Sequence, residues 1–66
     1  MRTISVKLYK SKKKAKVEVE TNNGMKETVY IEPCHGSYEQ YGANTDVLWH
    51  TLPIAEQLVE NNFETI

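Results

Sequence analysis

Apolar and polar residues alternate strictly in two segments near the start of the chain. The segments are residues 3–9 and 15–21, and their apolar positions are Ile4, Val6, Leu8, Ala15, Val17 and Val19. Alternation with a period of two is typical of β-strands that bury one face. Residues 10–13 contain no glycine, which favours a four-residue loop around a type I turn. This loop places Leu8 opposite Ala15 and Ile4 opposite Val19, and a shift by one residue would bury lysines.

A third strand is predicted over residues 25–32, where Val29 and Ile31 are the apolar positions. The preceding Asn22-Asn23-Gly24 permits a loop of two or of three residues. Two residues would turn Val29 and Ile31 away from the core, whereas three, with Gly24 in a left-handed bulge, keep both inward. The longer loop gives four pairs: Val17 with Val29, Ala15 with Ile31, Glu20 with Lys26, and Lys14 with Glu32. We therefore predict the three-residue loop.

No clear alternation follows the third strand. Pro33 is expected to end that strand, and residues 34–44, with two glycines, are typical of a loop. Residues 47–52 fit either a fourth strand or the first turns of a helix. Pro53 favours a helix that begins there, because proline suits a first turn and pushes the preceding residue towards an extended backbone. We therefore predict a short strand over 47–52 and a helix over 53–62.

The predicted helix buries a stripe made of Ile54, Ala55, Leu58, Val59 and Asn62. Together these elements predict one small α+β domain over residues 1–66, a three- or four-stranded antiparallel β-sheet (a meander) with one C-terminal α-helix packed on one face. Cys34 is the only cysteine, so no disulfide can form within the chain, which suits a reducing cytoplasm. No apolar run approaches the roughly 20 residues of a membrane span, and the N-terminal residues do not resemble a signal peptide.

A chain of 66 residues has a small core. Domains of this size bury only about 60% of the surface that the unfolded chain exposes, and many gain stability from a disulfide, a metal ion or a second subunit. Because no disulfide is available and no metal site is evident, we expect a homodimer.

The basic residues are concentrated at the start of the chain. Residues 1–16 hold seven of the eight, and all nine acidic residues come after them. A lysine cluster in the first hairpin, made of Lys10, Lys12, Lys13, Lys14 and Lys16, could follow a phosphate backbone. The scarcity of arginine, the absence of aromatic residues among the lysines apart from Tyr9, and the acidic remainder argue against nucleic acid. A solvated tip that limits edge-to-edge pairing, or a protein contact, is the favoured interpretation.

Cys34, His35 and His50 are candidates for nucleophilic or metal-binding chemistry. A reactive thiol needs a neighbouring base, but adjacent residues of an extended backbone point to opposite sides, so His35 is poorly placed for Cys34. Asp46 would complete a set of four zinc ligands, yet neither a CxxC nor an HxxxH spacing occurs. We therefore predict no catalytic residue, no metal ion and no cofactor, and we do not expect an enzyme.

Residues 36–42 contain two tyrosines among glycines and small polar residues, a composition typical of binding loops. Trp49 adds a large side chain of the kind that anchors protein partners. The alternative is that Tyr38 or Tyr41 folds over the sheet and closes the core. We interpret Tyr38, Tyr41 and Trp49 as candidate partner-binding residues.

These observations favour a small, non-catalytic accessory or regulatory protein that binds a protein partner. It would work in the cytoplasm as a homodimer or docked on a larger assembly, where its opposed charges would orient it. By analogy, a phage-type inhibitor or modulator of a nucleic-acid-handling complex fits this description. Direct nucleic-acid binding through the lysine-rich first hairpin is the second interpretation.

Overall fold

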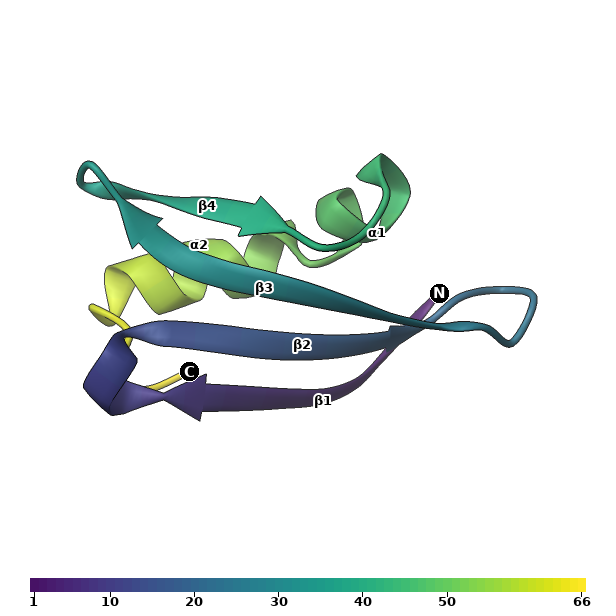
Figure 1. The fold of residues 1–66 in the computed structure, drawn as a ribbon, viewed down its shortest axis with the longest axis horizontal. Helices are drawn as coiled ribbons and strands as arrows, with labels where there is room; N and C mark the ends of the chain where they lie inside the picture. Colours follow the sequence, from purple (N-terminus) through teal and green to yellow (C-terminus); the bar gives the residue numbers. More distant parts are fainter.

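Four antiparallel strands follow one another along the chain and form one sheet in the order β1-β2-β3-β4. They are β1 (Arg2–Tyr9), β2 (Lys14–Glu20), β3 (Lys26–Cys34) and β4 (Ser37–Tyr41), and they are followed by α1 (Thr45–His50) and α2 (Leu52–Glu60). In this computed structural model, which describes residues 1–66, α2 crosses behind β3 and β4 (Figure 1). The predicted α+β meander with a C-terminal helix on one face is confirmed.

The first two hairpins have the predicted registers along most of their length, except at the start of β1 and at the end of the β2–β3 ladder. The observed apolar pairs are Leu8–Ala15, Val6–Val17, Val17–Val29 and Ala15–Ile31. A four-residue link joins β1 to β2, as expected; it contains a short 3₁₀ helix (Lys10–Lys12) and ends at Lys13, which has a φ of 49°. Glu20 faces Lys26, but the β2–β3 ladder ends at Ile31, before the expected pair of Lys14 with Glu32.

Gly24 closes the β2–β3 hairpin in the predicted three-residue loop. Its φ is 84°, and its N–H donates to the Thr21 carbonyl at 3.0 Å. The N–H of Thr21 donates in turn to the Met25 carbonyl at 2.8 Å. This arrangement is a type I turn followed by a bulge, and the positive φ explains why a glycine stands there.

Replacing Gly24 with alanine should lower the free energy of unfolding by about 1 kcal/mol, because an L-residue is strained at this φ. No atom lies within 4 Å of the position that a Cβ would occupy, so backbone strain alone would be measured. Urea unfolding of the two proteins tests this. An unchanged midpoint of unfolding would contradict the prediction that an L-residue is strained at position 24.

The pairing of β1 breaks near its start. Thr3 faces Val19 and Ser5 faces Glu18, so Ile4 is an extra residue in a β-bulge and is 40% exposed. The prediction that Ile4 pairs with Val19 is therefore wrong. The apolar face of the sheet ends at this point, because the β3 residue that pairs with Val19 is Glu27. The polar Thr3 can therefore occupy the inward position opposite Val19.

The β3 strand continues through Pro33, and the loop predicted over residues 34–44 is wrong over most of its length. His35 and Gly36, with φ values of 48° and 80°, form a two-residue turn that leads into β4. Such a pair of positive φ angles is typical of tight hairpins. Proline is tolerated because the β2–β3 ladder has already ended at Ile31, so β2 presents no carbonyl for the N–H that Pro33 lacks.

The predicted short strand over residues 47–52 is also wrong, because this segment is helical. The Asn44 side chain caps α1 by accepting a hydrogen bond from the Val47 N–H at 3.1 Å. At the junction of the two helices, the buried Thr51 hydroxyl donates to the Val47 carbonyl at 3.1 Å. Pro53 lies in the first turn of α2, as expected.

The core lies between the helices and the inner faces of β2 and β3. Its buried side chains are Ala15, Val17, Val19, Val29, Ile31, Val47, Ala55, Leu58 and Phe63. No helix combines the length and the apolar character that crossing a bilayer requires.

Helix α2 ends in a Schellman motif, which reverses the chain and inserts an aromatic ring into the core. Asn62, expected in the buried stripe, is instead exposed with a φ of 54°, and its N–H bonds to the Val59 carbonyl at 3.0 Å. The next N–H, of Phe63, bonds to the Leu58 carbonyl at 2.8 Å. Phe63 is 2% exposed. This turn therefore adds to the core an aromatic side chain that was not predicted from the sequence.

Candidate functional site

The structure does not gather the three candidate partner-binding residues. Tyr38 lies on the inner face of β4 and packs against the core. Tyr41 comes three positions later on the same strand and therefore points to the outer face, the side of the sheet away from the helices. Trp49 lies on α1 and is 67% exposed. Each of the three thus belongs to a different surface.

Trp49 borders a small apolar groove between α1, the start of α2 and β4. The groove has a volume of about 200 Å³ and is lined by Gln40, Thr45, Leu48, Trp49 and Leu52; we call it the Trp49 groove. The Gln40 amide donates to the Leu48 carbonyl at 3.0 Å and to the Thr51 hydroxyl at 2.8 Å. The floor of the groove is therefore fixed by hydrogen bonds, while the indole stands free beside it.

The two helices that border the Trp49 groove carry negative charge. Asp46, three residues before Trp49 on α1, is exposed, and so are Glu56 and Glu60 on α2. Residues 45–66 contain neither lysine nor arginine. The groove is therefore an apolar surface on helices that are acidic overall.

The outer face carries a row of four large side chains at one level of the sheet. Lys7 on β1 faces Lys16 on β2, Lys16 faces Tyr30 on β3, and Tyr30 faces Tyr41 on β4. We call these four residues the lysine–tyrosine row. The two tyrosine rings are stacked, with centroids 5.6 Å apart and planes at 26°. No helix covers this face (Figure 1).

The neighbouring row contains Tyr9 opposite Lys14, and Glu32 opposite Glu39. The Tyr41 hydroxyl donates to the Glu32 carboxylate at 3.4 Å. Desolvation by its neighbours, together with the negative charge of Glu32, raises the pKa of Tyr41 above its ordinary value of 10. Tyr41 therefore stays a protonated hydrogen-bond donor at neutral pH.

The lysine cluster is divided between the hairpin tip and the outer face. Lys10 and Lys12 are exposed at the tip, and Lys16 lies on the outer face of β2, as does Lys14. Lys13 turns towards the end of the chain, where its Nζ donates to the Asn62 carbonyl at 3.3 Å and lies 3.6 Å from a Glu64 oxygen. Four of the five lysines are thus free of carboxylate partners.

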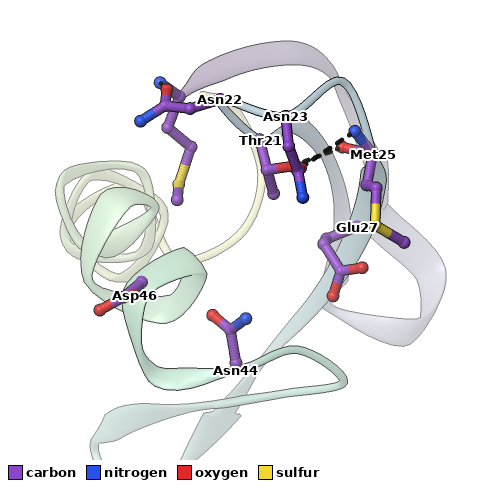
Figure 2. A pocket seen from close by; sticks show the side chains of 8 residues that line it. Thr21, Asn22, Asn23, Met25, Glu27, Asn44 and Asp46 are labelled. Atoms are coloured by element: carbon purple, nitrogen blue, oxygen red, sulfur yellow. Dashed lines mark hydrogen bonds between the residues drawn. The ribbon is translucent and has the colours of Figure 1, made fainter.

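The largest hollow lies at the far end of the sheet, below the β2–β3 loop. It has a volume of about 590 Å³ and is lined by Met1, Thr21, Asn22, Asn23, Met25, Glu27, Asn44 and Asp46 (Figure 2). Several of its polar groups already serve the fold. Asn44 caps α1, Thr21 and Asn23 bond to each other within the hairpin loop, and the N-terminal amine bonds to Asn22. We assign no chemistry to this hollow.

The candidate nucleophile Cys34 is far from His50. Cys34 is half-buried at the end of β3, and His35 is exposed in the following turn. His50 lies 3.1 Å, through Nε2, from the hydroxyl of Thr3, which stands at the opposite end of the sheet from Cys34. No group of three or more potential metal-ligating side chains occurs.

No protein-family model, curated protein or solved structure matches this chain. The candidate sites must therefore be interpreted from their own residues.

Sequence reasoning missed Tyr30 and Lys7 on the outer face, and Gln40, Leu48 and Leu52 in the Trp49 groove. For Tyr30 a signal was present, because the predicted β2–β3 register already sets Lys16 opposite Tyr30. For Lys7 a signal was present too, because the predicted β1–β2 register sets it opposite Lys16. For Gln40, Leu48 and Leu52 the signal depended on β4 and α1, which were not predicted from the sequence.

Proposed function

We propose that this chain is a non-catalytic binding protein that docks on a protein partner through the Trp49 groove. The supporting observation is the exposure of Trp49, 67%, beside an apolar groove with a fixed floor. Large aromatic side chains at the centre of a contact supply much of the binding energy at protein interfaces. A tryptophan exposed to this extent beside apolar neighbours gains most when a partner covers it.

The charges around the groove define the partner's chemistry. With Asp46, Glu56 and Glu60 exposed on the helices, the partner would offer an apolar side chain for the groove and lysine or arginine around it. Within this proposal the chain is a cytoplasmic accessory or regulatory protein, such as a phage-type inhibitor or modulator of a nucleic-acid-handling complex. Self-association as a homodimer remains part of the proposal, and light scattering of the purified protein tests it.

Replacing Trp49 with alanine should abolish partner capture and leave the fold intact, because the exposed indole contributes little to the packing of the core. The tagged wild type, Trp49→Ala and Met25→Ala would each be used to capture proteins from the native host, with mass spectrometry as readout. Met25 is a matched control, an apolar residue 60% exposed in the β2–β3 loop and outside the lining of the Trp49 groove. Partners kept by Met25→Ala and lost by Trp49→Ala are expected.

The captured partner would then be purified and titrated into the protein. Trp49 is the only tryptophan, so its emission should shift to the blue as the indole is buried. Removal of a central anchor should weaken the complex by about 2 kcal/mol or more, roughly thirtyfold in Kd. Equal capture by wild type and Trp49→Ala would overturn the proposal.

A further inference from the structure

We propose that the outer face of the sheet binds single-stranded nucleic acid, with bases stacked on Tyr30 and Tyr41 and phosphates held by Lys7 and Lys16. This inference does not depend on the Trp49 groove, because the two surfaces lie on opposite faces of the sheet, with Gln40 of β4 on the inner side and Tyr41 on the outer side. It concerns a second ligand of a different chemical class.

The first argument is the arrangement of the lysine–tyrosine row. Its four residues occupy directly opposed positions on four adjacent strands, so the row spans roughly 15 Å at the usual strand spacing. Within the row, positive charge lies on β1 and β2 and aromatic surface lies on β3 and β4. The outer face of β2 is basic only from Lys14 to Lys16, because Glu18 and Glu20 follow on the same face. Single strands are bound by this combination, a basic track beside aromatic rings on which bases stack.

The second argument is that the aromatic surface is held in position. The Tyr30 ring lies against the backbone of Gly42, where a Cβ would come within 3.0 Å of the ring carbon Cδ2. The ring also stacks on Tyr41, whose hydroxyl donates to the Glu32 carboxylate at 3.4 Å. The two rings are still 36% and 41% exposed. A ring that is already ordered loses little freedom when a base stacks on it.

The third argument is an electrostatic conflict that a phosphate would relieve. Lys7 and Lys16 face each other directly across two strands, and like charges in such a pair destabilise a sheet. The only ion pairs of the structure, Arg2–Glu20 and Lys13–Glu64, involve neither of them, although the Lys7 Nζ lies over the Tyr9 ring, 5.5 Å from its centroid. Lys10 and Lys12 at the tip and Lys14 beside the row add positive charge that has no carboxylate partner.

The acidic pair on the other half of the face sets the orientation of the ligand. Glu32 and Glu39 face each other on β3 and β4, next to the tyrosines, and would repel phosphate. Carboxylates accept hydrogen bonds from the exocyclic amino group of cytosine. The phosphates would therefore follow β1 and β2 while the bases lie over β3 and β4. This arrangement predicts a preference for oligo(dC) over oligo(dT).

The face also suits unpaired bases better than a duplex. Stacking on a side-chain ring requires a free base surface, which a duplex offers only at its ends. An acidic peptide could satisfy the lysines, but it would gain little from the tyrosines and would meet the repulsion of Glu32 and Glu39. Single-stranded nucleic acid is the one ligand that uses both halves of the face.

The test is fluorescence anisotropy with a labelled oligo(dC), measured over a range of salt concentrations. Wild type should bind with marked salt dependence, and a duplex of the same length should bind more weakly. The double variant Lys7→Gln/Lys16→Gln should reduce the slope of log K against log[salt] by about 1.4, at roughly 0.7 per phosphate contact. Lys26→Gln is the matched control, because Lys26 lies at the other end of the sheet, and it should bind like wild type.

The stacking role is tested separately with Tyr41→Leu, which keeps an apolar side chain but removes the ring. Its affinity should fall about tenfold with an unchanged salt slope. Thermal melts would verify that every variant is folded. If a variant does not fold, the wild type can be titrated with oligo(dC) and followed by NMR. The amide chemical shifts of residues on the outer face should then change, and those of α1 should not.

Three results would overturn the inference. The first is no binding of oligo(dC) by wild type at low salt. The second is an equal loss of affinity in Lys26→Gln and in the double lysine variant, which would indicate non-specific attraction. The third is effective competition by polyglutamate together with no effect of Tyr41→Leu, which would identify an acidic protein segment as the occupant.

Discussion

Replacing Phe63 with alanine should lower the free energy of unfolding by about 3–5 kcal/mol, the usual cost of truncating a buried aromatic ring. The ring is 2% exposed and belongs to the same core cluster as Ala15 and Leu58. Alanine would lose this burial and would still carry the φ of 57° that the turn imposes. Since domains of this size have stabilities of roughly 3–10 kcal/mol, a large fraction of the variant should be unfolded.

Urea unfolding followed by circular dichroism measures the effect of Phe63→Ala. Phe63→Leu is the control, because it keeps an apolar side chain at the same strained backbone position and should cost clearly less. A loss below about 1 kcal/mol for the alanine variant would mean that the ring contributes little to the core.

Gly42→Ala should be the most destabilising of the glycine substitutions, at about 2–4 kcal/mol. Gly42 has a φ of 101°, which strains any L-residue. A Cβ would also lie 3.0 Å from both the Thr28 carbonyl oxygen and the Tyr30 ring. The backbone oxygen cannot move without distorting β3, so the hairpin must shift.

The matched control for Gly42→Ala is Gly36→Ala. Gly36 has a similarly positive φ of 80°, but no atom lies within 4 Å of the added Cβ. The difference between the two variants in urea unfolding therefore isolates the cost of the steric clash. Equal losses at the two positions would show that Tyr30 moves aside freely.

The first three strands could be predicted because the alternation within each strand and the pairing between strands favour the same inward-facing residues. Alternation assigned the inner faces, and the Asn22-Asn23-Gly24 turn admitted only one loop length that kept Val29 inward. The bulge at Ile4 could not be predicted in the same way. It arises where the apolar face gives way to polar residues, and nothing local to Ile4 signals that change.

The fourth strand was missed because its inner face is not apolar. Gln40 points inward, and its amide is satisfied by the Leu48 carbonyl and the Thr51 hydroxyl. This partnership exists only after the helices have docked, so the alternation of residues 37–41 could not be recognised from the sequence. The His35-Gly36 turn was the local signal that could have been used.

The error over residues 47–52 has a different origin. Pro53 was interpreted as the first possible helical position, although Asn44 already provided a capping residue before Val47. The junction of the two helices just before Pro53 is held by Thr51. Its hydroxyl donates to the Val47 and Leu48 carbonyls of α1, and its carbonyl accepts from the Ile54 and Ala55 N–H groups of α2. The Trp49 groove exists only because this segment is helical.

The candidate sites were predictable in composition but not in arrangement. Trp49 and the lysines were recognised as residue types suited to binding. Their surroundings, an apolar groove in one case and a stacked tyrosine pair in the other, depend on β4 and α1. The sequence therefore predicted which side chains are suited to binding, but not the groove or the stacked pair in which they lie.

The meander topology has a consequence for the folding rate. Every strand pairs with the strand next to it in sequence, so most backbone hydrogen bonds of the sheet close short stretches of chain, and local contacts of this kind favour rapid folding. The contacts that depart from this pattern join the first hairpin to the helical segment that ends the chain, as between Thr3 and His50 and between Lys13 and Asn62. Closing these long loops carries the larger entropic cost, so the docking of residues 45–66, rather than the assembly of the sheet, would limit the speed of folding.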